Sequence, residues 1–377
     1  MTHAGAEREV FQKLRRAMRA AGCDALVAHS VDNVTYTAGF AVPSHPTNRF
    51  RRTITVLAGQ NFAAQIVVTV EANLARATSR FADVRTYDQF GDDPADALAD
   101  ALIEAGVGEG RIAVELDYLP AQDFLRLRER LPRATFVPAR DIYFSTRMIK
   151  TADEITRLTT VGTLTDRVAG EVLAAVRPGM SEKTLARLAT EKMLDGGCSA
   201  VKVQVGSGVR SGITNCAPTD KAIEPGDVLR LEILGDMNQY RSNVTRTAVV
   251  GAPTDEQRKI WDVMIGARER CKALLRPGTP VAALYRTYVD HLRANDIEPT
   301  LRFLGHGIGQ TIHEEPYITD ARDVVLEPDI TFTMEPLYMM PGRMGFHVED
   351  MYRVTPDGFV PITGTITPND ALIRVGG

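Results

Sequence analysis

Apolar positions in the first third of the chain alternate between helical and extended spacing. Val10, Leu14 and Met18 recur at the period of a helix over residues 7–21, and Gly22 follows as a typical helix-ending residue. Short apolar and β-branched runs then predict strands, with one further helix among them. The strands are expected at residues 24–30, 52–58, 63–70 and 111–116, and the helix at 93–105. This alternation predicts an α/β domain in which helices cover a sheet.

The apolar pattern is interrupted between residues 138 and 152, where we expect a domain boundary. Pro138 and the polar residues after it break the periodicity. Thr151 and Glu154 then have the spacing of a capping box, in which each residue satisfies a backbone N–H near the other. A long helix is therefore expected to begin there and to end before the Arg-Pro-Gly sequence at residues 177–179.

The second part of the chain contains a weak internal repeat. Residues 174–194 resemble residues 273–292, and Arg276 lies 99 positions after Arg177 with further identities at the same offset. Each copy predicts a helix, an Arg-Pro-Gly turn and a second helix, followed by β-rich sequence. Chance similarity between two common helical segments is the alternative. A duplication predicts one α+β domain with internal pseudo-twofold symmetry and a site between its halves.

Composition narrows the class of protein. The 377 residues include 44 Lys and Arg against 48 Asp and Glu, so neither a nucleic-acid partner nor a membrane surface is expected. No apolar run approaches the roughly 20 residues of a membrane span, and the charged N-terminus lacks a signal-peptide core. The four cysteines match no zinc-site spacing and are expected to be reduced thiols. These features predict a cytoplasmic protein.

The segment with the densest chemical signal is FLGHGIGQTIHEEPYI, residues 303–318. His306 lies between two glycines, which allow backbone to approach closely on both sides. His313 follows seven residues later and precedes two glutamates. Two histidines in a glycine-rich, acidic segment indicate a functional site. The alternative is one buried structural histidine and one surface histidine.

Two acidic segments follow. Glu335 ends the apolar run of residues 331–334 and precedes a proline, so it lies either at an exposed strand end or in a site. Residues 345–355 predict a strand in which His347 and Glu349 share one face and Asp350 lies on the other. Either Glu349 or Asp350 could be the exposed acid.

Residues 227–251 predict two strands joined by a turn at residues 235–238. Glu232 lies within an apolar run, where a carboxylate is costly unless it is paired or neutralised. Asn243 lies on the second strand and is placed to meet Glu232 across the hairpin. A hydrogen-bonded core amide is the alternative role for Asn243.

These segments, in this order, resemble the family of creatinase, prolidase, aminopeptidase P and methionine aminopeptidase. The HGIG and HEEP motifs carry the resemblance most specifically, while residues 21–40 resemble the start of the N-terminal domain more loosely. The resemblance covers essentially the whole chain. It implies an α/β N-terminal domain over residues 1–145 and a pita-bread catalytic domain over residues 146–377.

The chain departs from the family pattern at the metal site. Metallopeptidases of the family hold two metal ions with two aspartates, one histidine and two glutamates, and the resemblance places His306, Glu335 and Glu349 at retained ligand positions. Glu232 replaces the first aspartate, and Asn243 replaces the second. A neutral amide is a poor bridge between two cations, which argues against a two-metal site. One ion held by Asn243, His306, Glu335 and Glu349 is the alternative to no metal.

Without metal, the resemblance implies chemistry like that of creatinase or ectoine hydrolase. The main hypothesis is a hydrolase without a cofactor that opens a non-peptide C–N bond in a small guanidino or cyclic amidine substrate bearing a carboxylate. Glu232 would act as nucleophile or general base, and the histidines would transfer protons. The expected catalytic residues are Glu232, His306, His313, Glu335 and Glu349. The expected substrate-binding residues are Asn243, Asn215, His347, Phe50 and Arg52.

Several of these assignments rest on the family alone. Asn215 stands where relatives have a histidine, and Phe50 and Arg52 resemble residues that creatinase supplies from a partner subunit, which implies a homodimer. Arg51 is an equal candidate for the role of Arg52 if the strand is shifted by one residue, and a solvated basic loop is the alternative for Phe50 and both arginines. The competing functions are a single-metal Xaa-Pro aminopeptidase or dipeptidase and a non-catalytic binding protein of the same fold.

Overall fold

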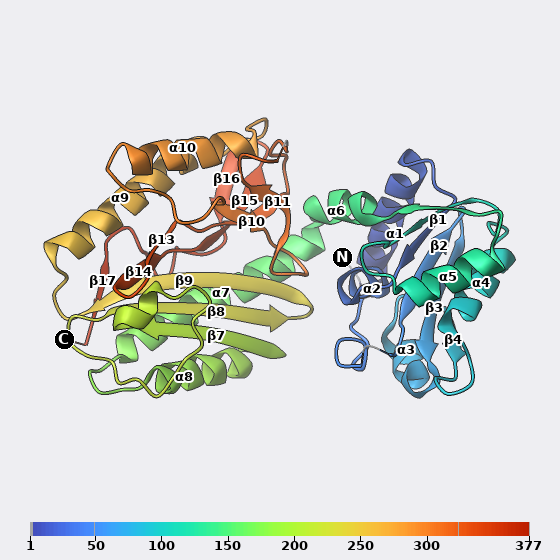
Figure 1. The fold of residues 1–377 in the computed structure, drawn as a ribbon, viewed down its shortest axis with the longest axis horizontal. Coiled ribbons are helices and arrows are strands. Elements are labelled where there is room, and N and C mark those ends of the chain that lie inside the picture. Colours follow the sequence, from blue (N-terminus) through green and yellow to red (C-terminus); the bar gives the residue numbers. More distant parts are fainter. Residues whose placement is uncertain (1–2, 49, 323, 377) are drawn as a thin grey trace. The chain divides into compact units, whose positions relative to one another are not determined.

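The computed structural model describes residues 3–48, 50–322 and 324–376, and it divides the chain into two compact units between Arg147 and Met148 (Figure 1). The interval 138–152, where the sequence suggested a boundary, contains helix α6 (Arg140–Met148) and then the start of α7 at Ala152. The capping box of Thr151 and Glu154 is formed as predicted. No described helix is long and apolar enough to cross a bilayer.

The first unit is built on a six-stranded sheet in the order β4-β3-β2-β1-β5-β6. Alternate residues of β1 enter two separate apolar cores, Leu26 and Ala28 on one face and Ala25 and Val27 on the other. Both faces of the sheet are therefore covered by helices, as the sequence predicted. The strands are β1 (Ala25–Ala28), β2 (Ile54–Ala58), β3 (Phe62–Val68), β4 (Asp83–Tyr87), β5 (Arg111–Val114) and β6 (Thr135–Pro138). The helices are α1 (His3–Ala20), α2 (Val31–Ala38), α3 (Ala72–Thr78), α4 (Pro94–Glu104), α5 (Ala121–Arg130) and α6.

The second unit contains the two helix pairs that the internal repeat predicted. Helices α7 (Ala152–Ala175) and α8 (Glu182–Asp195) form the first pair, and α9 (Asp255–Lys272) and α10 (Val281–Arg293) form the second. Both Arg-Pro-Gly turns end on a glycine in the left-handed region, Gly179 with φ 88° and Gly278 with φ 90°. Only glycine adopts this conformation without strain, which explains why both copies keep the motif.

Two sheets lie between these helix pairs (Figure 1). One sheet has the order β17-β9-β8-β7 and packs against α7 and α8, and the other has the order β11-β10-β12-β15-β16 and packs against α9 and α10. A bridge between Thr245 and Glu349 connects them. The strands of the first sheet are β7 (Ala200–Ser207), β8 (Val228–Met237), β9 (Tyr240–Val250) and β17 (Ile373–Val375). The remaining strands are β10 (Gly305–Gly307), β11 (Glu314–Ile318), β12 (Thr331–Met334), β13 (Leu337–Met340), β14 (Met344–His347), β15 (Asp350–Thr355) and β16 (Gly358–Pro361).

The hairpin of β8 and β9 differs from the sequence prediction at its turn. The strand continues through Gly235, and the two turn residues are Asn238 and Gln239, with φ of 50° and 68°. Positive φ at both central positions is typical of the tight turns that match the twist of a hairpin. The four cysteines are unpaired, as expected of reduced thiols.

Candidate functional site

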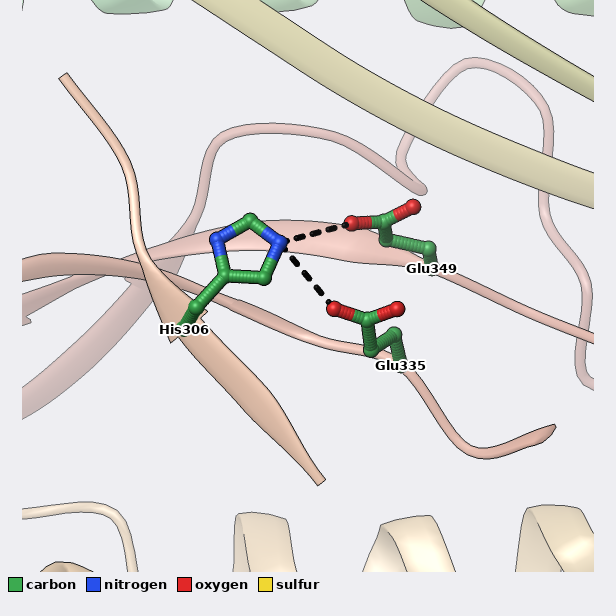
Figure 2. Close-up of side chains that lie close together, drawn as sticks. All are labelled: His306, Glu335 and Glu349. Carbon is green, nitrogen blue, oxygen red and sulfur yellow. Dashed lines mark ion pairs between the residues drawn. The ribbon is translucent and has the colours of Figure 1, made fainter. Parts of the chain in front are cut away.

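The side chains that the sequence singled out in the second unit converge between its two sheets. His306 comes from β10, Glu335 follows β12, and Glu349 precedes β15. One donor atom from each of the three lies within 4.8 Å of the others, and all three residues are buried (Figure 2). Segments that are far apart in the sequence therefore form one compact polar cluster.

His306 is held in one orientation and one tautomer. Its flanking glycines are required, because a Cβ at Gly305 would collide with the carbonyl oxygen of Thr333 and one at Gly307 with that of Glu315. The ring Nδ1 donates to the carbonyl oxygen of Gly307 at 2.9 Å, so Nε2 is the nitrogen directed at the two glutamates. Burial acts to lower the pKa of His306, but Glu335 outweighs burial and raises this pKa. Nε2 lies 3.1 Å from Oε1 of Glu335 and 3.8 Å from Oε1 of Glu349.

Glu335 lies between two imidazoles. Besides His306, the Nε2 of His347 lies 3.2 Å from Oε2 of Glu335 and 4.0 Å from Oε2 of Glu349. Burial acts to raise the pKa of Glu335, but the two histidines outweigh it and lower this pKa to about 2. Glu335 is therefore ionised at neutral pH.

Glu349 is in a contrasting environment although it lies in the same cluster. It is completely buried, and its Oε2 accepts a hydrogen bond from Oγ1 of Thr245 at 3.0 Å. Burial first, and then the nearby charges of Glu335 and Glu232, raise the pKa of Glu349 well above its usual value. Asp350, the neighbour that the sequence left as an alternative exposed acid, is also buried. The cluster thus carries more carboxylate than its own histidines can neutralise.

Glu232 and Asn243 face the same space from β8 and β9. In the hairpin register Glu232 is opposite Thr245 and Asn243 is opposite Leu234, so the two residues are diagonal neighbours rather than directly paired. Glu232 accepts a hydrogen bond from Nε2 of Gln204 at 2.9 Å, and burial raises its pKa. Oδ1 of Asn243 is buried and has no hydrogen-bond partner among the residues described.

A cavity of about 210 Å³ adjoins the cluster. His313 lies in its wall and stacks on His306, with ring centroids 3.7 Å apart. Burial, followed by repulsion from His306, lowers the pKa of His313 to about 4, so its imidazole is neutral at pH 7. Asn215 lies at the exposed edge with φ 54°. The full lining is Thr214, Asn215, Arg230, Glu232, Asn243, Leu301, Phe303, His313, Glu335, Leu337 and His347.

Two expected substrate-binding residues, Phe50 and Arg52, belong to the first unit. They line a separate cavity of about 320 Å³ together with His29, His45 and other residues. The guanidinium of Arg52 bonds to the carboxylate of Asp123 at 2.5 Å. Their expected role in substrate binding stays a prediction.

The buried histidines of this second cavity predict a pH-dependent stability. Burial lowers the pKa of His29 to about 3 and that of His45 to about 4, with Arg52 adding to both effects. Because unfolding restores the usual value of about 6.5, each histidine destabilises the fold by about 1.4 kcal/mol per pH unit as pH falls below 6.5. The His45→Gln variant is expected to remove one such contribution between pH 6.5 and 4.

This effect is measured by hydrogen exchange on the full-length protein, as the protection of backbone amides in peptides from the first unit at several pH values. The protein has a single tryptophan, Trp261, in the second unit, so its fluorescence reports the other unit separately. An unchanged pH slope of protection in the His45→Gln variant contradicts the prediction.

Sequence reasoning missed two residues of the site region. Arg230 lines the cavity beside Glu232, and Gln204 donates a hydrogen bond to Glu232. For Arg230 the signal was present, because the period of a strand places it on the same face as Glu232. Gln204 carries no such signal, since its position depends on how β7 pairs with β8.

The donor set of the cluster fits one divalent metal ion. A histidine nitrogen with two carboxylates is a common set for zinc and similar ions, and ligands about 2.1 Å from one centre lie roughly 3.0–3.4 Å apart. Nε2 of His306 and Oε1 of Glu349 are buried, and neither has a hydrogen-bond partner in the described part of the chain. No second group of three such donors occurs among the described residues. The arrangement of His306, Glu335 and Glu349 therefore suits a divalent ion.

Comparison with known proteins assigns the family. Residues 156–356 match metallopeptidase family M24, and residues 11–149 match the creatinase/prolidase N-terminal domain. The chain belongs to metallopeptidase family M24. It is 30% identical over 371 residues to the protein named Probable dipeptidase PepE of Mycobacterium tuberculosis, covering 97% of both chains.

Solved structures of this M24 protein's relatives agree with the pita-bread fold. The crystal structure of dipeptidase PepE from Mycobacterium ulcerans has a TM-score of 0.88 at 28% identity, covering 100% of this chain and 99% of that one. The Xaa-Pro dipeptidase from Bacillus anthracis has a TM-score of 0.84 at 25% identity, covering 98% of this chain and 100% of that one. The predicted fold class and family are thereby confirmed.

Two expectations were wrong. The main functional hypothesis, a metal-independent hydrolase of a guanidino or cyclic amidine substrate, is contradicted by relatives that are named dipeptidases and Xaa-Pro dipeptidases. The expectation of no cofactor conflicts with membership of a metallopeptidase family.

The physical reason for both errors is visible in the cluster. Losing the carboxylate at Asn243 removes a bridge between ions, but it leaves the three donors of one ion in place. The coarser expectation of a hydrolase is supported.

Proposed function

We propose that this M24 protein is a metal-dependent dipeptidase that uses one divalent ion bound by His306, Glu335 and Glu349. The observation that carries the proposal is the convergence of these three buried donors within 4.8 Å. The unpartnered Oδ1 of Asn243 faces the same space and is available as a fourth, neutral ligand. The substrate class follows the names of the relatives, which include dipeptidases and Xaa-Pro dipeptidases.

The protein's own residues prepare the site for this reaction. The hydrogen bond to Gly307 fixes Nδ1 of His306 as the donor and directs Nε2 at the cluster, and the hydrogen bond from Thr245 orients Glu349. When bound, the ion supplies charge stabilisation at the reacting carbonyl. Glu232 is a buried carboxyl with a raised pKa, which suits the transfer of a proton to or from the reacting groups.

The cavity favours a small substrate. Its volume of about 210 Å³ is below the roughly 300–1,000 Å³ of typical ligand pockets, and its wall combines apolar side chains with the polar cluster. The neutral imidazole of His313 lies in that wall and is available to exchange a proton with the leaving amine. Leu301, Phe303 and Leu337 offer an apolar surface to a proline ring or a similar side chain.

Metal content and turnover test the proposal together. We expect purified protein, dialysed against Mn²⁺ or Zn²⁺, to retain close to one equivalent of metal per chain and to hydrolyse L-alanyl-L-proline or another dipeptide. Treatment with a chelator is expected to abolish hydrolysis, and added metal to restore it. Full dipeptidase activity after complete metal removal, or no hydrolysis of any dipeptide at any metal loading, contradicts the proposed function.

A further inference from the structure

The cavity beside the cluster contains a buried cation, Arg230. Its side chain is 2% exposed and lines the cavity together with Glu232, which lies two residues further along β8 on the same face. Two residues of a strand span about 6.6 Å, so the guanidinium and the carboxyl occupy neighbouring parts of one wall. Arginine is almost never this deeply buried without an anionic partner.

The guanidinium of Arg230 has only weak or partial compensation inside the protein. One terminal nitrogen donates to the carbonyl oxygen of Ile213 at 2.6 Å, and the other lies 3.0 Å from Sδ of Met339. A thioether sulfur is a weak acceptor, and a guanidinium has five N–H donors. Within the described residues no carboxylate forms an ion pair with it. Burial lowers the pKa of Arg230, while Glu232 partly opposes this effect.

We propose that Arg230 binds the C-terminal carboxylate of the substrate and thereby makes the enzyme selective for dipeptides. This inference rests on the proposed function. A carboxylate is the group that a guanidinium binds with paired, charge-assisted hydrogen bonds, and a substrate carboxylate would supply the anion that the protein lacks at this position.

The spacing suits a dipeptide. Three covalent bonds, a contour of about 4.3 Å, separate the scissile carbonyl carbon of a dipeptide from its carboxylate carbon. Together with a hydrogen bond of about 2.8 Å from the guanidinium to the carboxylate, this length matches the roughly 6.6 Å along β8 between Glu232, beside the cluster, and Arg230. In a longer peptide or a peptide amide, an uncharged group would lie against the guanidinium and leave its charge without an anion. Selection then comes from the penalty for leaving Arg230 unpaired.

Paired substrates test the role of Arg230. We expect the metal-loaded wild-type protein to hydrolyse L-alanyl-L-proline with a kcat/KM about 10- to 100-fold above that for L-alanyl-L-prolinamide, the range expected for a hydrogen bond between charged groups. In Arg230→Gln this ratio is expected to fall to near one, because only the reaction of the free acid is impaired. Arg230→Lys keeps the charge and should retain part of the preference. Arg343→Gln, an exposed ion-pair residue, is the matched control.

A binding measurement separates this inference from the proposed function. L-Proline, but not L-prolinamide, should raise the melting temperature of the metal-loaded wild-type protein, and Arg230→Gln should lose this shift whether or not any peptide is hydrolysed. Trp261 fluorescence checks that each variant is folded. If Arg230→Gln does not fold, the same measurements are made on Arg230→Lys. The inference is overturned if the acid and the amide are affected equally, if the wild type does not discriminate between them, or if the shift by L-proline persists in Arg230→Gln. Such results would leave Arg230 as a support for the Ile213 loop.

Discussion

Glu335→Gln is expected to release the bound metal and to lower kcat/KM for a dipeptide by about 10³-fold or more. The substitution keeps the shape of the side chain but removes the negative charge that both His306 and His347 face at 3.1–3.2 Å. An amide is a poor ligand for a divalent ion beside a histidine and one remaining carboxylate. Loss of several kcal/mol of charge stabilisation corresponds to a rate loss of this size. Elemental analysis and steady-state kinetics on the same preparation measure both effects.

The control for this experiment is Glu327→Gln, which makes the same chemical change at an exposed position of the second unit. It is expected to keep full metal content and activity. Metal bound at one equivalent in Glu335→Gln, with kcat/KM within threefold of the wild type, would exclude His306, Glu335 and Glu349 as the ligand set.

Most of the fold was predictable because its signals are local. The capping box of Thr151 and Glu154 needs only four residues, and the Arg-Pro-Gly turns need one residue with positive φ each. The repeat then indicates two similar halves. The exact turn of the β8–β9 hairpin was not predictable, because Gly235 is as compatible with a turn as Asn238 and the choice depends on pairing across the sheet.

The site was predictable where the sequence constrains the backbone around a polar residue. His306 has glycines on both sides, and Glu335 is followed by a proline. Glycine and proline are unusual inside a strand, so they mark these two polar residues as more than ordinary strand positions. Arg230 has no such flanking residues and lies within an apolar run, which predicts an ordinary strand position. The predicted function was wrong for a different reason: the amide at Asn243 removes one carboxylate, but the sequence does not show that His306, Glu335 and Glu349 still lie together as ligands of an ion.

Arg246→Met is expected to destabilise the second unit by about 3–5 kcal/mol, the usual result of removing one partner from a buried ion pair. The guanidinium is fully buried and contacts Asp166 at 2.9 Å and Asp350 at 2.8 Å. It also donates to the carbonyl oxygen of Glu349, which joins the network to the metal cluster. Arg246 helps to hold the pKa of Asp350 below its usual range despite burial, so the variant leaves acids that must take up protons or remain uncompensated.

Urea unfolding followed by Trp261 fluorescence measures this change, because the single tryptophan is buried in the same unit against Phe346. Arg258→Met, at an exposed pair with Asp255, is the control and should change the free energy of unfolding by less than about 1 kcal/mol. The network predicts a further effect, since Asp350 is the first residue of β15 and directly follows Glu349 in the chain. The Arg246→Met variant should therefore also bind metal more weakly. A variant as stable as the control would show that the two aspartates are neutralised without Arg246, with Arg268 at 3.5 Å from Asp350 as the remaining cation.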